Sequence, residues 1–316
     1  MLHKICYGVI RLLVFVLKKF KFDIQSFDKI IFCVGHVQIS KNRDKYSEIT
    51  DLTQAEAKIF SQNGEDGIID YLSCRLELSS KNFVEIGVGN YRESNTRFLY
   101  NTYHPKGLIV DYIDNMQAKV KPFVNLWKGD LRICNKNINS ENILEVINQW
   151  CDFEIDIFSM DIDSIDYWII KKLKNNISKI FVAEYNPVFG PYLEVTVPNI
   201  PGFDRTKYHY SNLCYGMSLR ALINLMHEKN YYFIGANLQK INAFFVSKDF
   251  SKKEFFPKIN IKSLENYTNS NIRDSKDKFN NLSYLSGDEK FKIIQECEVI
   301  NLKDNQSILS TLKKLK

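Results

Sequence analysis

Short apolar segments alternate with amphipathic stretches through the middle of the chain. Apolar segments of strand length lie at residues 83–86, 107–110, 123–127, 155–160 and 180–183. Residues 143–150 and 167–173, which lie between some of them, have the periodicity of helices. This alternation is typical of a parallel sheet whose strands are joined by crossover helices. The pattern therefore predicts an α/β domain over residues 61–249.

Two further apolar segments indicate how the sheet ends. Residues 231–234 and 243–246 are separated by a connection of hairpin length. A hairpin makes its second strand antiparallel to its first. Together with the five earlier segments, this pair predicts a Rossmann-like, seven-stranded, mostly parallel sheet with an antiparallel closing strand.

The pattern changes on either side of this domain. Residues 22–60 form a leading region, in which residues 30–37 predict a short strand and residues 53–60 predict a helix with Thr53 as its N-cap. Residues 250–316 are polar and rich in Asn and Lys, with short amphipathic pieces. We expect them to form a helical accessory tail.

Residues 1–21 predict a basic amphipathic helix. Apolar residues recur there at helical spacing, while Lys4, Arg11 and Lys18 lie seven apart on another stripe. The longest apolar run, residues 12–17, is too short to span a bilayer. Two interpretations stay open: the helix lies on an anionic membrane surface, or its apolar face packs on the domain.

Charge and cysteine content narrow the class of protein. The net charge is +6, and five basic residues precede the first acid, Asp23, so the rest of the chain is close to neutral. A nucleic-acid partner is therefore not expected. The seven cysteines form no Cys-x-x-Cys motif, which argues against a zinc ribbon or a disulfide framework and is typical of a reducing cytosol.

The segment 83–90 combines an apolar run with an acid and two glycines. Glu85 precedes Gly87 and Gly89, while Arg92 stands where a dinucleotide fingerprint requires a third glycine. Glycine lets the backbone approach a ligand that any Cβ would push away. An acid followed by Gly-x-Gly resembles the turn that holds S-adenosylmethionine (SAM) in class I methyltransferases.

Acidic residues stand at the ends of all five apolar segments. They are Glu85, Asp111, Asp130, Asp161 with Asp163 and Asp166, and Glu184, which is followed by the amide Asn186. In open α/β sheets ligands bind beyond the carboxyl ends of the strands, so we expect these side chains to share one polar site. The alternatives are that Asp130 only forms a turn and that Asp163 only caps a helix.

Each acid has a candidate task in a SAM site. Asp111, with Asp114 as a substitute, would accept hydrogen bonds from the ribose hydroxyls. Asp130 would accept a hydrogen bond from the adenine amino group, and Asp161 would lie near the methionine ammonium. A negative charge there is favourable for the cationic ligand.

The acids after the fourth and fifth segments also bring together several carboxylate oxygens, which are ligands for hard cations. Asp161, Asp163 and Glu184 are candidate ligands for Mg²⁺ or another divalent cation, which would lower the pKa of a substrate hydroxyl. The spacing Asp161-x-Asp163 is also similar to the Asp-x-Asp motif of metal-dependent glycosyltransferases.

Several segments together resemble the FkbM-like group of class I SAM-dependent methyltransferases. They are residues 60–67, 83–95, 159–168, 215–222, 235–237 and 242–246, within a resemblance that covers about residues 60–248. The resemblance implies a SAM-dependent methyltransferase that acts on hydroxyls of sugars or polyketide-like products. It also implies that Gln62 and Glu65 lie near the cofactor. Tyr91 departs from the pattern, because many such turns have a small residue there.

A long insertion, residues 187–213, is the candidate substrate side. Its prolines and aromatics favour an ordered lid over a substrate, although the tyrosines would equally pack on the core. His209 is the only histidine in this insertion and the candidate general base. Asp161, Asp163 and Glu184 are the alternative catalytic groups, directly or through a metal.

These observations predict an O-methyltransferase acting on a small-molecule or glycan acceptor. The expected role is polysaccharide biosynthesis in a bacterium, with a sugar or a capsule or lipopolysaccharide precursor as substrate. The expected location is the cytoplasm, with peripheral contact to the inner membrane through residues 2–21. The alternatives are a metal-dependent glycosyltransferase that uses Asp161-x-Asp163, or a non-catalytic SAM-binding scaffold.

Overall fold

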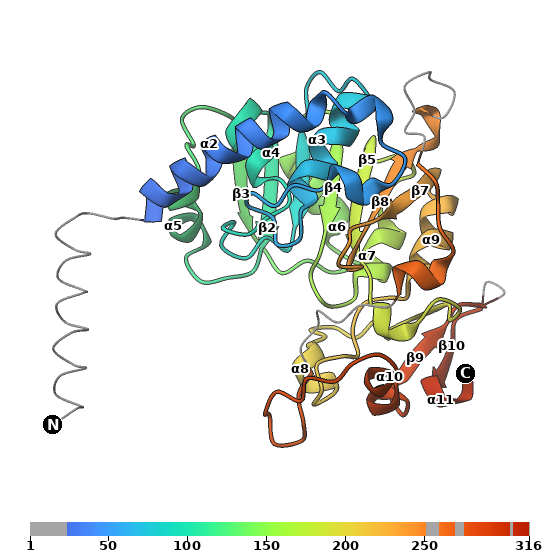
Figure 1. Ribbon diagram of the computed structural model, residues 1–316. Helices are drawn as coiled ribbons and strands as arrows, with labels where there is room; N and C mark the ends of the chain where they lie inside the picture. Colours follow the sequence, from blue (N-terminus) through green and yellow to red (C-terminus); the bar gives the residue numbers. More distant parts are fainter. Residues whose placement is uncertain (1–23, 251–258, 269–274, 304–305, 316) are drawn as a thin grey trace, which may run out of the picture.

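The computed structural model in Figure 1 describes residues 24–250, 259–268, 275–303 and 306–315. The basic helix expected over residues 1–21 lies outside these ranges. Among the helices within them, none has the length and apolar character that crossing a bilayer requires.

A seven-stranded sheet forms the centre of the molecule. Its strands are β1 (Phe83–Ile86), β2 (Gly107–Asp111), β3 (Leu131–Asn135), β4 (Ile157–Met160), β5 (Ile180–Glu184), β7 (Tyr231–Ala236) and β8 (Asn242–Ser247). Their spatial order is β3-β2-β1-β4-β5-β8-β7, and β8 runs antiparallel to both of its neighbours. The predicted fold class, a mostly parallel Rossmann-like sheet with one antiparallel closing strand, is confirmed.

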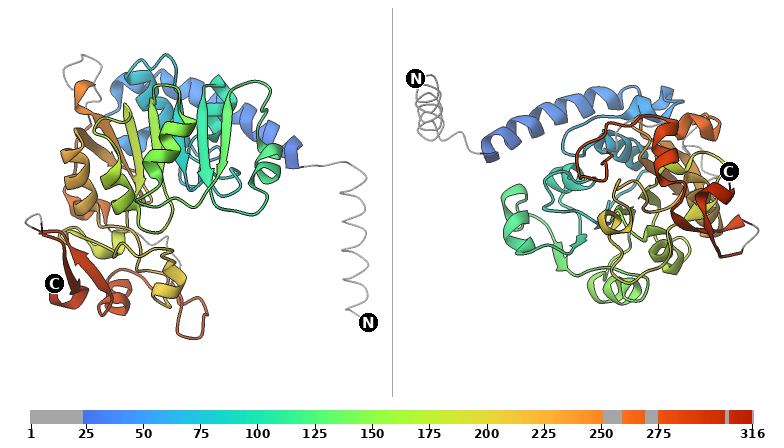
Figure 2. Two further views of the ribbon diagram at one scale, coloured as in Figure 1. Left: turned by 180° about the vertical axis from the view of Figure 1, so that it is seen from behind. Right: turned by 90° about the horizontal axis from the view of Figure 1, so that it is seen from below.

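Helices cover both faces of the sheet, as Figure 2 shows from two further directions. One face packs against α6 (Ile143–Trp150), α7 (Asp166–Lys172) and α9 (Leu219–Glu228). The other face packs against α3 (Glu65–Arg75), α4 (Arg97–Tyr103) and α5 (Met116–Val120). Successive strand residues point to opposite faces, so both sides of the sheet are apolar and the strand segments read as continuous apolar runs.

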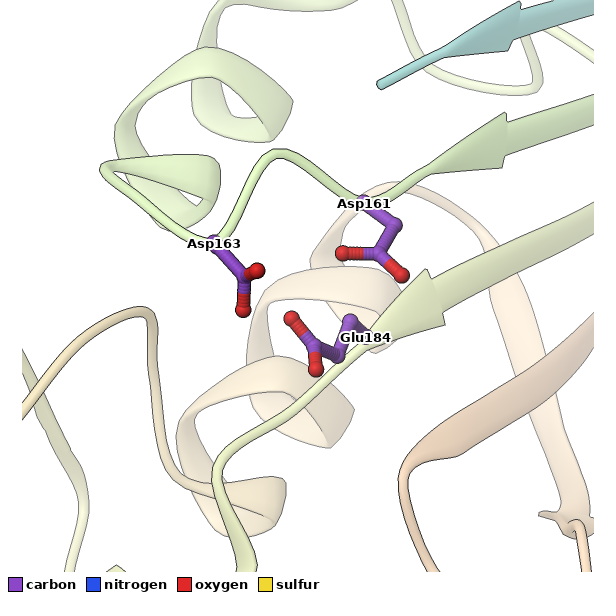
Figure 3. A group of neighbouring side chains, drawn as sticks. All are labelled: Asp161, Asp163 and Glu184. Carbon is purple, nitrogen blue, oxygen red and sulfur yellow. The ribbon is translucent and has the colours of Figure 1, made fainter. Parts of the chain in front are cut away.

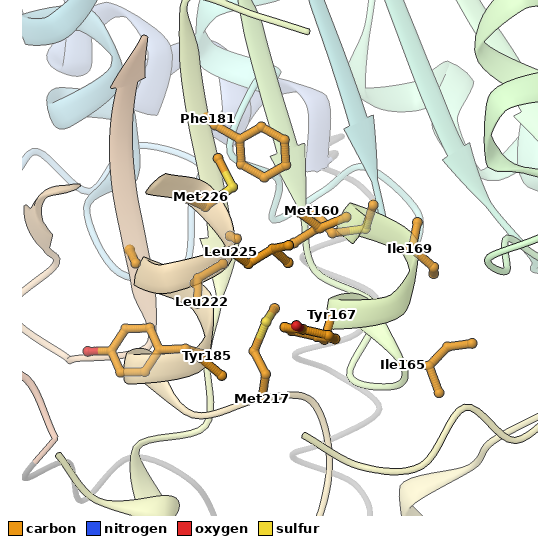
Figure 4. Close-up of a cluster of buried hydrophobic side chains, with 14 of the residues drawn as sticks. Met160, Ile165, Tyr167, Ile169, Phe181, Tyr185, Met217, Leu222, Leu225 and Met226 are labelled. Atoms are coloured by element: carbon orange, nitrogen blue, oxygen red, sulfur yellow. The ribbon is translucent and has the colours of Figure 1, made fainter. Parts of the chain in front are cut away.

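The core on the α7 and α9 side is shown in Figure 4. Met160 of β4 and Phe181 of β5 lie there together with Leu222 and Met226 of α9. All four side chains are almost fully buried. Burial of this apolar surface holds the crossover helices on the sheet and so fixes where each strand ends.

The leading region differs from its prediction in both of its elements. Residues 30–37 belong to a helix, α2 (Ile24–Arg43), and not to a strand. Their β-branched residues suggested a strand, but the apolar residues lie on two different faces of a helix. The predicted helix at residues 53–60 is also wrong, because only the short 3₁₀ helix η2 (Leu52–Ala55) forms there, capped by Asp51. The short 3₁₀ helix η1 (Tyr46–Glu48) precedes it.

The third strand lies later in the chain than predicted. Residues 123–127 contain the end of a 3₁₀ helix, η3 (Lys121–Phe123), and a turn, whereas β3 begins at Leu131. The apolar character of residues 123–127 reflects packing of Val124 on the α5 side of the sheet. Asp130 therefore precedes its strand and lies at the amino edge of the sheet, opposite the predicted site.

A second, smaller sheet joins the insertion to the tail. It contains β6 (Val195–Thr196), β9 (Glu298–Asn301) and β10 (Ile308–Thr311). The other elements of these regions are η4 (Pro187–Phe189), α8 (Arg205–Tyr208), η5 (Lys248–Phe250), η6 (Leu264–Tyr267), α10 (Asp288–Ile294) and α11 (Leu312–Leu315). The expectation of a helical tail thus missed two strands, because β9 pairs with β6, about a hundred residues earlier in the sequence, and β10 pairs with β9.

Candidate functional site

A cavity of about 510 Å³ lies at the carboxyl ends of β1, β4 and β5. Its described walls carry more acidic than basic side chains. The acids are Glu85, Glu93, Asp161, Asp163 and Glu184, and the bases are Arg205 and Lys276. This excess of negative charge favours a cationic ligand.

Gly87 joins β1 to the end of β4. Its φ angle is +89°, and a Cβ built at this position would lie 1.5 Å from the backbone oxygen of Asp161. Gly89 has a φ of +54° but open space around the corresponding Cβ position. A glycine is therefore needed at position 87 because the loops after β1 and β4 come too close there for a side chain. This close approach also brings Asp161 to the turn.

Glu85 is buried beneath the turn and holds the next segment of the chain. Its carboxylate accepts hydrogen bonds from the Ser94 hydroxyl (2.6 Å), the Asn95 amide (2.8 Å) and the Thr96 amide (3.0 Å) and hydroxyl. Burial raises the pKa of Glu85, while these donors lower it. The Glu85-to-Thr96 motif is therefore a closed hydrogen-bonding unit that shapes the turn.

Asp111 lies where the sequence predicted it, at the end of β2. One carboxylate oxygen accepts the Gly89 amide at 2.6 Å. Asp111 lines a second cavity of about 290 Å³, whose walls include Ile138 and Phe203. Gly87 contributes to both cavities, so they adjoin at the turn.

The acids of β4 and β5 converge, as Figure 3 shows. Asp161, Asp163 and Glu184 each present a carboxylate oxygen within 4.8 Å of the others. Asp163 also accepts a hydrogen bond from the Arg205 guanidinium at 2.6 Å. Arg205 lies over the ring of Tyr215, whose hydroxyl donates to Glu184 at 3.4 Å.

The loop before α3 supplies another wall of the larger cavity. Gln62 lines it and donates a hydrogen bond to Glu93 at 3.3 Å. Glu65 is instead fully buried and accepts from the side-chain amides of Asn237 (2.7 Å) and Asn242 (2.8 Å). Glu65 thus ties α3 to the turn between β7 and β8, which positions Asn242 on the cavity wall.

Two residues that the sequence proposed for the site lie elsewhere. Asp130 is at the opposite edge of the sheet and pairs with Arg132 at 2.9 Å, because the third strand begins after it. His209 ends α8 and does not line the larger cavity. Its Nδ1 lies 2.7 Å from the Ser211 hydroxyl, and burial lowers its pKa. The imidazole therefore lies beside Ser211 and off the wall of the larger cavity.

Asp166 and Asn186 also have structural tasks. Asp166 is buried and accepts the amides of Ile162 and Ser164, which shapes the loop before α7. Burial raises its pKa to about 6. Asn186 caps η4 and donates to the backbone oxygens of the segment after α8. These two residues support the acidic cluster from outside the cavity.

The sequence did not indicate three polar residues of the larger cavity. Arg205 and Asn212 come from the insertion, and Lys276 comes from the tail. Arg205 and Asp163, which form an ion pair, are 42 residues apart in the sequence, so no local motif predicts this pair. The one available signal was Asp204, a helix N-cap that fixes the start of α8 directly before Arg205.

Comparisons with known proteins give only distant similarities. No family model matches the chain, and no curated protein matches it significantly. A SAM-dependent methyltransferase from Clostridium acetobutylicum superposes over 58% of this chain and 90% of its own, with 11% identity and a TM-score of 0.37. An O-methyltransferase from Bacillus cereus, in complex with SAH, superposes over 66% and 88%, with 10% identity and a TM-score of 0.37.

A third similar structure is a putative O-methyltransferase from Klebsiella pneumoniae. It superposes over 66% of this chain and 88% of its own, with 12% identity and a TM-score of 0.37. At this level of similarity the fold has to be argued from the strand order, and the function from the residues of the site.

Proposed function

We propose that this protein is a SAM-dependent methyltransferase. The supporting observation is the pair of cavities that adjoin at Gly87, between the carboxyl ends of β1 and β4. The strand order reverses between β1 and β4, since β2 lies on one side of them and β5 on the other. Such a switch point is the general ligand-binding position of open α/β sheets.

The two cavities match the two ends of SAM. Asp111 accepts hydrogen bonds from the ribose hydroxyls, since each carboxylate oxygen has a lone pair left after binding the Gly89 and Tyr112 amides. Ile138 and Phe203 form apolar walls for the adenine in the smaller cavity. Asp161 attracts the methionine ammonium, with the charge of Glu85 below it. When bound, SAM supplies an electrophilic methyl group on a cationic sulfur.

The acceptor occupies the larger cavity next to the acidic cluster. Side-chain amides of Gln62, Asn95, Asn212 and Asn242 line this cavity and offer both donors and acceptors of hydrogen bonds. Such a wall suits a polyhydroxylated molecule, so we propose O-methylation of a sugar or of a surface-glycan precursor. A role in bacterial polysaccharide biosynthesis follows from this substrate class.

Glu184 is the proposed general base for the acceptor hydroxyl. Its carboxylate lines the larger cavity, whereas that of Asp163 is held by Arg205 at 2.6 Å. The Tyr215 hydroxyl orients Glu184 by its hydrogen bond. Replacing Glu184 by Gln should leave SAM binding intact and abolish methyl transfer, because Gln cannot accept the proton.

Asp161, Asp163 and Glu184 also have the donor chemistry for Mg²⁺ or another divalent cation. Carboxylate oxygens within 4.8 Å of one another satisfy part of an octahedral oxygen shell. Arg205 competes for the same charge, since it already pairs with Asp163. Metal dependence is thus a separate proposal, which methyl-transfer assays with EDTA and with added Mg²⁺ test directly.

Calorimetry with SAM and with nucleotide-sugars, each with and without Mg²⁺, tests the function. We expect SAM to bind and nucleotide-sugars not to bind. The glycosyltransferase alternative is less well supported, because Asp163 pairs with Arg205 and because that reaction leaves the Gly87 turn without a role. Binding of a nucleotide-sugar without binding of SAM would overturn the proposal.

Transfer of a radiolabelled methyl group from SAM into cell extracts then identifies the acceptor. We expect label in a carbohydrate fraction with the native chain and none with Glu184→Gln. SAM binding without any labelled product would instead indicate a non-catalytic SAM-binding scaffold.

A further inference from the structure

The helix α2 has two apolar faces, and one of them packs on a core cluster of the described residues. The inner face carries Phe32, Gly35 and Ile39, which lie against the cluster that contains Ile59 and Phe98. Gly35 permits the close contact, because a Cβ there would lie 2.7 Å from the Ile59 side chain. The inner face therefore provides the apolar part of the docking of α2, beside its ion pairs with α3 and α4.

The outer face carries four further large apolar residues. They are Ile30, Ile31, Val34 and Val37, with between 42% and 61% of each residue exposed. Spacings of three and four residues place them on one side of the helix. Figure 1 shows that α2 runs along the outside of the molecule and does not contact the main sheet directly. A continuous apolar stripe of this kind is typical of an interaction surface.

Basic residues lie in two hollows beside α2. Lys29 lines one of them together with Lys121 and Lys128. Ile31 lines a second hollow together with Lys58 and Arg92.

Opposing negative charge is scarce along α2. Asp28 is the one acidic residue in its sequence, and Asp28 is paired with the buried Arg97 at 2.5 Å. Glu93, in the second hollow, accepts a hydrogen bond from Gln62. The surroundings of the stripe are thus predominantly basic.

An exposed tryptophan lies next to Lys128, which lines the first hollow beside α2. Trp127 is 83% exposed and follows η3, which contacts α2. The ammonium of Lys128 lies 5.4 Å from the centre of its ring. Tryptophan next to lysine is a common combination at the level of lipid headgroups.

We propose that the outer face of α2 binds the surface of an anionic lipid bilayer. The apolar stripe would enter the boundary between headgroups and acyl chains, and the basic residues of the two hollows would contact the lipid phosphates. A second copy of the chain is a poorer partner for this surface. A two-fold symmetric contact through the same face would bring two sets of these basic residues together at the cost of charge repulsion.

Flotation of the full-length protein with vesicles tests this surface. The vesicles are phosphatidylcholine alone, or phosphatidylcholine with about one-quarter phosphatidylglycerol. The test variant is Ile30→Gln with Val34→Gln. The matched control is Ile308→Gln with Leu309→Gln on β10, since these residues are also about half exposed, at 50% and 54%.

We expect the native chain and the β10 variant to bind the anionic vesicles equally. The α2 variant should bind at least about tenfold more weakly, because two large apolar side chains no longer enter the lipid. Lys29→Gln with Lys121→Gln should weaken binding to anionic vesicles and reduce its salt dependence. Unchanged thermal unfolding of each variant shows that the fold is intact.

Two results would overturn the proposal. One is equal vesicle binding by the native chain and the α2 variant, which would leave any membrane contact to other parts of the protein. The other is a lipid-free dimer, seen by sedimentation, that the α2 variant converts to a monomer. Neither result bears on SAM binding, since the outer face of α2 and the cavities at Gly87 involve different residues.

Discussion

The carboxyl ends of β1 and of β4 with β5 lie side by side, yet they are built in different ways. At β1, Glu85 accepts hydrogen bonds from Ser94 and Thr96, which lie nine and eleven residues later in the sequence. After β4, Asp163 accepts a hydrogen bond from Arg205, which lies 42 residues later and in another element. The β1 end is thus a local structure that its own motif specifies, whereas the β4 and β5 end depends on the tertiary arrangement.

Gly87 is the point where the two ends meet, so its substitution should have the largest effect. Gly87→Ala should destabilise the protein by about 3 kcal/mol or more, because its Cβ would collide with the Asp161 carbonyl and its φ is unfavourable for alanine. Gly89→Ala is the matched control and should cost about 1 kcal/mol, from the φ angle alone. Urea unfolding of both variants measures the difference, and equal losses would contradict it.

The second prediction concerns pH and the loop beside the β1 end. Asp66 is buried and accepts the amides of Ile59, Phe60 and Ser61 with one oxygen. Its other oxygen has no hydrogen-bond partner among the described residues. Burial raises its pKa from 3.8 to about 7. The folded state thus retains a proton that the unfolded state has already lost, so this contribution to stability is present at low pH and declines as the pH rises through about 7.

Asp66→Asn removes this titration while keeping the hydrogen-bond acceptor. Between pH 5 and 8 the unfolding free energy of the native chain should fall on the order of 2 kcal/mol more than that of Asp66→Asn. Urea titrations at several pH values measure both slopes. Parallel slopes for the two proteins would show that Asp66 is ionised throughout.

The same contrast explains what the sequence could predict of the fold. The strands of the main sheet were recognisable where apolar runs are buried on both faces, as in β1 and β5. The third strand was not, because Leu131, Arg132 and Ile133 are only partly buried at the edge of the sheet. The helix α2 was missed because its outer apolar residues hid the helical periodicity.

The site was predictable to a similar extent. Gly87, Asp111 and Glu184 could be placed because each stands at the carboxyl end of its own strand. Arg205 could not, because its position depends on how the insertion returns across the sheet. His209 was chosen by its chemistry alone, and packing places it next to Ser211 instead of on the wall of the larger cavity.

The third prediction concerns the tertiary part of the site. Arg205→Gln removes the cation that pairs with Asp163, so the acidic cluster should bind Mn²⁺ roughly tenfold more tightly. Lys207→Gln makes the same change of charge on the same helix, at a side chain that is 84% exposed, and should have little effect. Calorimetry with Mn²⁺ compares them. Equal affinities for the two variants would show that Arg205 does not control the cluster.

The most direct test of the proposed SAM site compares two aspartates at opposite edges of the sheet. Asp111 ends β2 at the cavities, and Asp130 precedes β3 at the far edge. By calorimetry, Asp111→Asn should weaken SAM binding roughly tenfold, because the charged acceptor for the ribose hydroxyls is lost. Asp130→Asn should bind SAM as the native chain does. Absence of SAM binding by the native chain, or equal weakening by both substitutions, would contradict a SAM site at Gly87.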